Sequence, residues 1–240
     1  MTHDGGIVLS TAEASSTTEA TGQSGNDTIR APIESRVKSG ARSGLSGFAR
    51  VRHEHYVEEP WVSARLFAAR RGELHVPGLV VLDPAAGFGH IVGSARAAGH
   101  EAIGTDLIKR APSVRGGRDF LSAHYRRPRR GRPLAIACNP PFGLFREFTE
   151  KALRLADVWV AVLIHTRRLN AAGVWLTRLP LQRILYVTPR PSMWPGAIYR
   201  QRLADGLSLG TGWEDFCWLI FKVGGRYRGE AGWLEREGRG

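Results

Sequence analysis

A run of asparagine, two prolines and phenylalanine, Asn139–Phe142, follows the apolar segment Leu134–Cys138. Successive prolines fix φ near about −65° and lack a backbone donor, so the turn is stiff and its carbonyl oxygens are free acceptors. An amino group conjugated to a ring is a weak nucleophile, because its lone pair is delocalised. The side-chain oxygen of Asn139 and the carbonyl of Pro140 can accept its two hydrogens, while Phe142 stacks on the ring. We predict a clamp for a planar NH₂ group, with a purely structural turn as the alternative.

A glycine turn flanked by two acids is the second candidate site. Asp83 ends the apolar run Leu79–Leu82, Gly87 and Gly89 follow, and Asp106 ends the next apolar run. Glycines permit torsions and a close ligand approach that a Cβ would block. An acid before the turn suits a cationic group better than a phosphate, and the second acid can accept hydrogen bonds from ribose hydroxyls. This combination predicts S-adenosylmethionine as the cofactor, with an ordinary strand-to-helix turn as the alternative.

Buried strands and amphipathic helices must position these two turns. Continuous apolar runs predict strands, which are Leu79–Asp83, Ala102–Asp106, Leu134–Cys138, Val158–Ile164, Arg183–Val187 and Phe216–Val223. The predicted helices are His90–Ala98 and Phe145–Ala156. Alternating strands and helices predict an α/β fold with a mostly parallel sheet covered on both faces. Arg118–Leu121 is predicted to end a further strand, where Asp119 would accept the adenine amino group of the cofactor; a surface turn is the alternative.

The two ends of the chain differ from this pattern. Residues 1–47 are rich in Ser, Thr, Gly, Ala and Glu without apolar periodicity, which predicts a disordered N-terminal tail. Residues 48–223 form the predicted catalytic domain. Residues 224–240 are charged and Gly-rich, which predicts a flexible C-terminal tail in which Trp233 and Leu234 are the residues able to dock.

Composition bounds the environment and the partners. The 240 residues carry a formal net charge of +12, and no apolar run has the length of a membrane span. No secretory signal is recognisable, so we expect a soluble, cytoplasmic protein without membrane contact. Cys138 and Cys217 each lie in an apolar run, which predicts reduced core residues and no metal site. We expect a monomer whose basic excess attracts a nucleic acid.

Two arginine-rich segments are candidate phosphate contacts. The first immediately precedes the clamp strand and contains Arg126, Arg127, Arg129 and Arg130. The second contains Arg190 and Arg200 among prolines and aromatic residues. A solvated loop is the alternative for the first segment, and a loop packed on the core is the alternative for the second.

The order of these motifs resembles the class I S-adenosylmethionine-dependent methyltransferases. The NPPF run is similar to that of the adenine-N6 DNA methyltransferases, in particular small phage and bacterial members with the gamma-type motif order. The resemblance covers residues 50–223, and Tyr56–Val62 resembles a segment that packs over the methionine end of the cofactor. It implies a Rossmann-like class I methyltransferase fold, with a mostly parallel seven-stranded sheet and an antiparallel last hairpin. Glu59 stands before Pro60 where relatives often carry threonine, and no added target-reading domain is recognisable.

The resemblance also implies site residues. The cofactor-binding residues would be Tyr56, Asp83, Ala85, Gly87, Phe88, Gly89, Asp106, Leu107, Asp119, Phe120 and Asn139. The catalytic residues would be Asn139, Pro140, Pro141 and Phe142.

The expected activity is therefore transfer of a methyl group to the N6 amino group of adenine in DNA, after the base is flipped from the helix. The clamp recognises a chemical group and not a whole molecule, so a ribosomal RNA base or a protein glutamine amide is an alternative substrate. A non-catalytic nucleic-acid-binding protein that keeps the fold is the second alternative.

Overall fold

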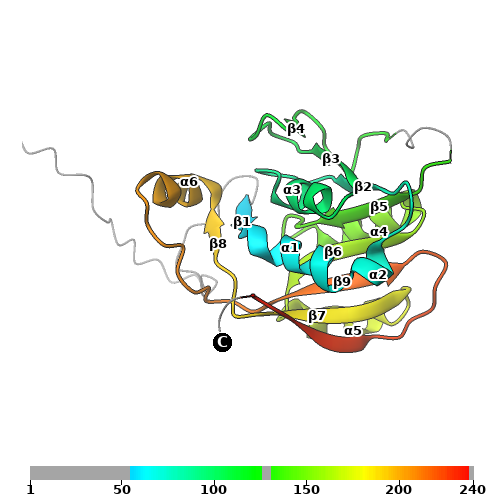
Figure 1. Ribbon diagram of the computed structural model, residues 1–240. Coiled ribbons are helices and arrows are strands. Elements are labelled where there is room, and N and C mark those ends of the chain that lie inside the picture. Colours follow the sequence, from blue (N-terminus) through cyan, green and yellow to red (C-terminus); the bar gives the residue numbers. More distant parts are fainter. Residues whose placement is uncertain (1–54, 126–130, 238–240) are drawn as a thin grey trace, which may run out of the picture. The chain divides into compact units, whose positions relative to one another are not determined.

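The computed structural model describes residues 55–125 and 131–237 (Figure 1). The predicted tail at residues 1–47 lies outside these ranges, as do Arg126, Arg127, Arg129 and Arg130. The strands are β1 Tyr56–Glu58, β2 Val80–Asp83, β3 Glu101–Thr105, β4 Val114–Arg115, β5 Leu134–Cys138, β6 Trp159–His165, β7 Leu181–Thr188, β8 Met193–Pro195, β9 Phe216–Lys222 and β10 Glu230–Glu235. The helices are α1 Pro60–Ala69, α2 Arg71–Leu74, α3 His90–Ala97, α4 Phe145–Leu155, α5 Arg168–Leu176 and α6 Gly196–Ala204.

Eight strands form one sheet in the order β10-β7-β9-β6-β5-β2-β3-β4. All neighbours pair in parallel except β9, which is antiparallel to both β6 and β7. The predicted Rossmann-like α/β fold with a mostly parallel sheet is confirmed. The chain leaves β2 for β3 on one side and reaches β5 on the other, so the strand order reverses between β2 and β5. In open α/β sheets, ligands bind outside the carboxyl ends of the strands at such a point.

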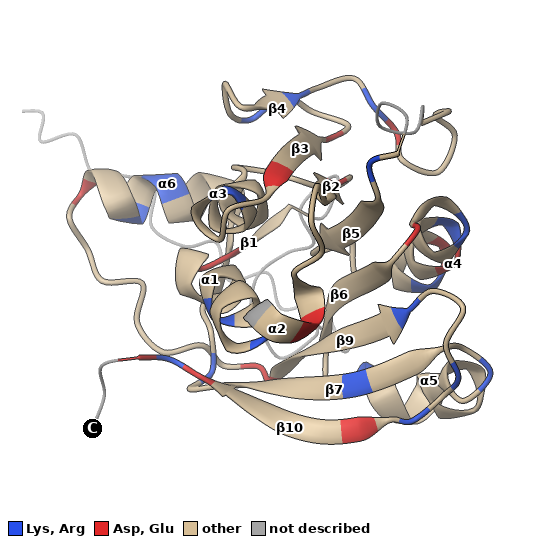
Figure 2. Ribbon diagram, turned by 45° about the vertical axis from the view of Figure 1, so that its right-hand side comes forward, with Lys and Arg blue, Asp and Glu red and all other residues tan. Residues whose placement is uncertain are grey.

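Side chains alternate between the two faces of the sheet and build a core on each. Val81 joins the core under α1 and α3, whereas Val80 and Leu82 join the core under α4 and α5. The same alternation holds in β6 and β9, which explains why these strands are apolar at nearly every position. Figure 2 shows that the central strands β5 and β6 carry no charged residue along their length, whereas β7 and β10 do.

Two predictions about the sheet are wrong. The sheet has eight strands and not seven, because β10 pairs in parallel with β7 inside the predicted flexible tail. Leu234 is buried with 1% of the residue exposed, while Trp233 is 67% exposed beside Tyr186. A charged segment with a single inward-facing residue shows no apolar periodicity, so this strand could not be predicted from the sequence. The outer strand beside β3 is β4, and Arg118–Leu121 forms no strand.

A second, two-stranded sheet joins β1 to β8 in antiparallel pairing, with Val57 opposite Trp194. The sequence predicted neither strand. The pairing holds the segment before α1 against the segment that leads into α6, and α6 contacts β1 (Figure 1). This small sheet places Tyr56 and Glu58 next to the glycine turn after β2.

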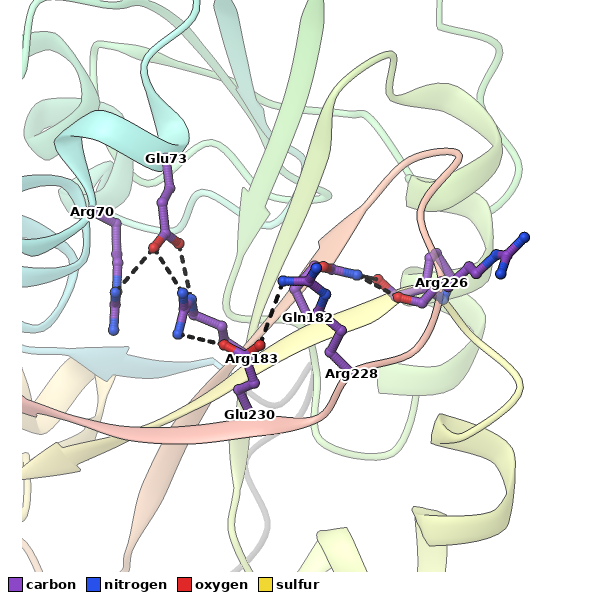
Figure 3. Close-up of polar contacts among 8 residues, drawn as sticks. Arg70, Glu73, Gln182, Arg183, Arg226, Arg228 and Glu230 are labelled. Carbon is purple, nitrogen blue, oxygen red and sulfur yellow. Dashed lines mark hydrogen bonds and ion pairs between the residues drawn. The ribbon is translucent and has the colours of Figure 1, made fainter.

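A network of charged side chains, here called the rim network, covers the outer edge at β7 and β10 (Figure 3). Glu73 forms ion pairs with Arg70 at 3.2 Å and with Arg183 at 3.0 Å. Glu230 forms ion pairs with Arg183 at 2.9 Å and with Arg228 at 3.5 Å. Every acid in the network therefore faces at least one guanidinium group.

None of the helices in residues 55–125 and 131–237 combines the length and apolar character that a bilayer crossing requires.

Candidate functional site

A cavity of about 370 Å³ opens beyond the carboxyl ends of β2 and β5, where the strand order reverses. Both predicted turns reach it. The residues that line it are His55, Tyr56, Val57, Glu58, Pro84, Ala85, Ala86, Gly87, Phe88, His90, Asp106, Leu107, Arg110, Arg118, Asp119, Phe120, Asn139, Pro141, Gly143, Leu144 and Phe148.

The glycine turn forms one wall of the cavity. Gly87 and Gly89 have φ values of +49° and +84°, which L side chains rarely adopt. A Cβ on Gly87 would also lie 2.6 Å from Nε2 of His55, so both the torsion and the available space require glycine. Gly89 caps the N-terminus of α3 and does not line the cavity. The turn therefore presents backbone atoms to a ligand.

Asp106 holds the turn and faces the cavity from the end of β3. Its Oδ2 accepts the Gly87 N–H at 2.9 Å, and its Oδ1 accepts the Ile108 N–H at 2.9 Å. Arg110 donates to the same Oδ1 at 2.7 Å. A carboxylate accepts about four hydrogen bonds, so Asp106 has capacity left for a ligand hydroxyl.

Asn139 lies just beyond β5, and its side-chain amide is held in one orientation. Nδ2 donates to the carbonyl of Tyr56 at 3.2 Å and to Oε2 of Glu58 at 2.9 Å. A backbone carbonyl only accepts, so the NH₂ side of the amide must face Tyr56. Oδ1 is buried and has no hydrogen-bond partner within the described part of the chain. A buried oxygen without a donor costs about 1–3 kcal/mol, and an N–H from a ligand would satisfy it.

Two carboxyl groups lie buried at this end of the sheet. Glu58 lines the cavity with 8% of the residue exposed, and Asp83 is 2% exposed. Burial raises the pKa of Glu58, although the hydrogen bond from Asn139 and the nearby His90 oppose the shift. Burial also raises the pKa of Asp83 well above its ordinary value, and the neighbouring Glu58 adds to the rise. Neither acid pairs with lysine or arginine in the described ranges, so a cationic ligand would be stabilised here.

The clamp residues are placed differently from one another. Asn139 and Pro141 line the cavity, whereas Pro140 and Phe142 do not. The Pro141 carbonyl accepts the Leu144 N–H at 2.8 Å. Within residues 55–125 and 131–237, no hydrogen bond uses the Pro140 carbonyl, which leaves it available as an acceptor.

Phe142 does not present a free face to the cavity, which corrects the prediction for this ring. It stacks on Tyr56 with ring centroids 5.2 Å apart and planes at 18°. His165 meets it edge-on at 4.3 Å and also packs on Phe216. Burial lowers the pKa of His165 to about 3, so this support is a neutral ring at neutral pH. The sequence showed an aromatic residue but not the aromatic partners that cover it.

Of the eleven predicted cofactor-binding residues, nine line the cavity. The nine are Tyr56, Ala85, Gly87, Phe88, Asp106, Leu107, Asp119, Phe120 and Asn139. Asp83 lies beneath the turn, where its Oδ1 accepts the Ala85 N–H at 3.1 Å, and it does not reach the cavity. Asp119 lines the cavity from a turn and not from a strand end, and its oxygens accept Leu121 N–H and Ser122 O–H. Of the two buried acids, Glu58 lines the cavity and Asp83 does not.

A cluster of aromatic rings and one arginine stands at the cavity wall. Phe88 contacts His55 at 5.0 Å and Tyr199 at 5.8 Å between ring centroids. Arg200, on α6, lies over Phe88 at 5.1 Å, so this predicted phosphate contact lies beside the cavity. Burial and the neighbouring Arg110 lower the pKa of His55 to about 4.

The predicted contact Arg190 is already paired. Its guanidinium binds both carboxylate oxygens of Asp215, at 2.7 and 3.2 Å. A nucleic acid phosphate would have to compete with this carboxylate, which makes Arg190 a weaker candidate than Arg200.

Several cavity residues were missed from sequence. Glu58, His90 and Arg110 are the polar ones whose chemistry bears on a ligand. Nδ1 of His90 donates to the Glu58 carbonyl oxygen at 2.8 Å, because a backbone carbonyl only accepts. Glu58 had a signal, because it lies in the Tyr56–Val62 segment that resembles a cofactor-covering segment, and His90 had one because it directly follows the glycine turn. Arg110 lies in a loop without any recognisable pattern.

Cys138 and Cys217 are buried free thiols, as predicted. Burial raises the pKa of Cys217 to about 12 and that of Cys138 well above its ordinary value, so neither is a nucleophile at neutral pH. Within the described residues, no three His, Cys, Asp or Glu side chains are grouped as a metal site requires.

Comparisons with known proteins support the fold. No protein-family model matches the chain. No curated protein matches it either. Among solved structures, a hemolysin candidate from Lactococcus lactis is similar with a TM-score of 0.50 and 14% identity, covering 75% of this chain and 94% of its own. At this identity the similarity establishes a shared fold alone.

Two further structures have lower scores. A candidate RNA methyltransferase from Pyrococcus horikoshii has a TM-score of 0.47 and 19% identity, with 68% of this chain and 82% of that chain covered. A modification subunit of a candidate type I restriction enzyme from Vibrio vulnificus has a TM-score of 0.47 and 15% identity, with 77% and 48% covered. Scores below 0.5 establish nothing about the activity of this chain.

Proposed function

We propose that this protein is an S-adenosylmethionine-dependent methyltransferase that modifies the N6 amino group of adenine in DNA. The observation that carries the proposal is the Asn139 amide. Its NH₂ side is bound to Tyr56 and Glu58, and its oxygen is buried and without a donor in the described chain. An oxygen fixed in this way can accept a hydrogen from an amino group that enters the cavity.

The residues present fit the proposed cofactor. A volume of about 370 Å³ lies in the range of about 300–1,000 Å³ of small-molecule sites. Asp106 would accept hydrogen bonds from the ribose hydroxyls. Leu107 and Phe120 also line the cavity and would pack against the adenine ring of the cofactor. Glu58 would face the cationic amino acid part, where its buried carboxylate compensates the positive charge.

When bound, S-adenosylmethionine supplies a methyl group that is electrophilic because it is attached to a sulfonium. The chain contributes position and polarity. Asn139 Oδ1 would accept a hydrogen bond from one N–H of the target amine, and the Pro140 carbonyl, which has no partner in the described ranges although Pro140 does not line the first cavity, would accept one from the other N–H. Both hydrogen bonds increase electron density on the nitrogen. After the methyl group has moved from sulfur to nitrogen, the product releases one proton to solvent. The stiff prolines keep both acceptors in place, so the nitrogen can approach in line with the bond that breaks.

Access of the base requires a rearrangement of aromatic side chains. Flipping an adenine from a duplex costs a few kcal/mol, and stacking on an aromatic ring offsets part of that cost. The ring face of Phe142 that could stack on a base is covered by Tyr56. We therefore expect the Tyr56 ring to leave Phe142 when the base enters from the side of Pro141 and Leu144.

A single experiment separates the candidate functions. Purified protein is incubated with methyl-labelled S-adenosylmethionine and, in parallel, with DNA, ribosomal RNA or a glutamine-bearing protein, and the modified product is identified by mass spectrometry. We expect N6-methyladenine in the DNA arm. Label in RNA or in a glutamine amide instead would support the proposed role of the clamp but contradict DNA as the substrate.

Calorimetry with S-adenosylmethionine tests the alternative that the protein is not an enzyme. Cofactor binding without transfer to any of the three substrates contradicts the proposed substrate class. The absence of cofactor binding at millimolar concentration contradicts the enzyme itself and favours a nucleic-acid-binding protein that only keeps the fold.

A further inference from the structure

A second cavity of about 240 Å³ lies next to the clamp, between the start of α4 and the start of α5. Gly143 borders both this cavity and the first one. Arg146 and Glu147 line it from α4, and Arg168 lines it from α5. None of these residues has a part in the chemistry proposed above.

The two arginines of this second cavity have unused donors. Arg146 donates from Nη2 to the Ala171 carbonyl at 2.9 Å, and the Nε of Arg168 is buried without any hydrogen-bond partner in the described chain. Neither forms an ion pair with a carboxylate of residues 55–125 or 131–237. The adjacent Arg167 differs, because it pairs with Glu214 at 3.2 Å.

Aromatic rings hold the two guanidinium groups in place. Arg168 lies over Phe145 at 5.7 Å, and Arg146 lies over Trp175 at 5.3 Å. Trp175 is itself fixed by a hydrogen bond to Glu150 at 3.1 Å. Planar groups that stack on rings keep their in-plane donors directed outward, which is the geometry that binds an anion with two acceptor oxygens.

The N-terminus of α4 adds to the positive potential of the second cavity. No side chain caps this helix of eleven residues, so its first N–H groups, at 145–147, lack a side-chain acceptor. Such termini favour anions. Glu147 is the one acid that lines the cavity, and two guanidinium groups with the helix terminus outweigh it.

We propose that this second cavity binds a backbone phosphate of the nucleic acid whose base enters the first cavity. This inference rests on the proposed function for the identity of the nucleic acid. The net charge of +12 favours a polyanionic partner, and a nucleic acid is the polyanion whose base the first cavity is proposed to receive. Gly143, shared by both cavities, places the phosphate beside the turn that receives the base.

The first test measures how DNA binding depends on salt. Affinity for a fluorescent duplex is measured by anisotropy over a salt series, for the wild type and for the Arg146→Gln/Arg168→Gln variant. Arg154→Gln is the matched control, because Arg154 lies exposed in the last turn of the same helix and the change removes the same kind of charge. One lost phosphate contact lowers the slope of log K against log salt by about 0.9.

We expect a slope lower by about 0.9 in the double variant and an unchanged slope in Arg154→Gln, with equal cofactor affinity in all three by calorimetry. A double variant that matches the control in slope and affinity overturns the phosphate site while leaving the proposed enzyme intact. A wild type that binds no nucleic acid overturns both.

The second test removes the phosphate charge instead of the arginine. Single methylphosphonates are placed in turn at the steps around the target adenine, and binding is measured with the wild type and with Arg146→Gln and Arg168→Gln separately. We expect one step at which the wild type loses affinity about tenfold and the single variants lose clearly less. An equal loss in all proteins overturns the proposal, and the single variants answer the question even if the double variant does not fold.

Discussion

Acidic side chains occur in two very different settings in this protein. In the rim network, Glu73 and Glu230 are each 45% exposed in their side chains, and each faces arginine (Figure 3). Glu58, which lines the first cavity, and Asp83, which lies beneath the glycine turn, are buried and have no arginine or lysine partner in the described chain. The first arrangement has balanced charge and ready access to water. The second has raised pKa values and an amide oxygen that lacks a donor.

The difference shows where the protein keeps unsatisfied groups. Exposed ion pairs contribute about 0–1 kcal/mol each, so the rim network adds little beyond local order. Buried carboxyl groups without a cationic partner destabilise the folded state when they ionise, and sites of this kind concentrate where a ligand completes them. The cavity therefore contains acceptors that a cationic cofactor and an amino group would satisfy.

The largest effect is expected at the clamp. Asn139→Ala removes the oxygen that accepts the target N–H, and loss of one preorganised hydrogen-bonding group costs about 10²–10³ in rate. We expect methyl transfer to fall by at least about 100-fold, measured under saturating cofactor. Cofactor affinity, followed by calorimetry, should change far less, and transfer at the wild-type rate would remove the basis of the proposed function.

Glu58→Gln is expected to have the next largest effect. Glutamine keeps an oxygen that accepts from Asn139 Nδ2 but removes the charge that faces the cationic cofactor. We expect the Kd for S-adenosylmethionine to rise about tenfold, which is about 1.4 kcal/mol, with a smaller change in kcat. Glu73→Gln in the rim network is the matched control and should leave the Kd unchanged. Equal effects of the two substitutions would contradict the distinction between the two acidic sites.

Asp83→Asn should stabilise the protein at neutral pH. Burial raises the pKa of Asp83 well above 3.8, so as pH rises past 3.8 the unfolded chain loses this proton while the folded chain keeps it. The wild type therefore loses stability over the window from 3.8 to the raised pKa, and asparagine has no such loss. We expect equal Tm values near pH 4 and, at neutral pH, a Tm higher by about 2–4 °C in the variant, the shift that about 1 kcal/mol produces in a domain of this size.

The outcome against this prediction is a Tm difference that stays constant, or shrinks, as the pH rises from 4 to 8. Such a result would mean that Asp83 ionises at its ordinary pKa in the folded protein.

The smallest effect is expected in the rim network. Glu73→Gln should lower the free energy of unfolding by less than about 1 kcal/mol, because its partners remain hydrated. Denaturant titrations at about 0.01 M and 1 M salt should show the difference shrinking as the Debye length falls. A larger, salt-independent loss would show that the two acidic settings are energetically alike.

Elements with strong local patterns were predicted closely. The strand Leu134–Cys138 has the predicted bounds, and the helix at α4 differs by one residue at its end. A run of apolar residues between polar ones constrains the backbone wherever the sheet lies. β1, β8 and β10 were not predicted. β1 and β8 have three residues each and β10 has one buried residue, so none shows an apolar pattern, and each depends on the strand it joins.

The sequence by itself determined the order of the strands along the chain, the two turns and the residue types that they carry. Tertiary structure alone decided how those side chains are used. The Asn139 amide is oriented by Tyr56 and Glu58, which lie 83 and 81 positions earlier in the chain. Phe142 is covered by that same distant segment, and Glu58 lines the cavity whereas Asp83 does not. Periodicity reports the local backbone, whereas the partner of a side chain depends on which distant segments the fold brings together.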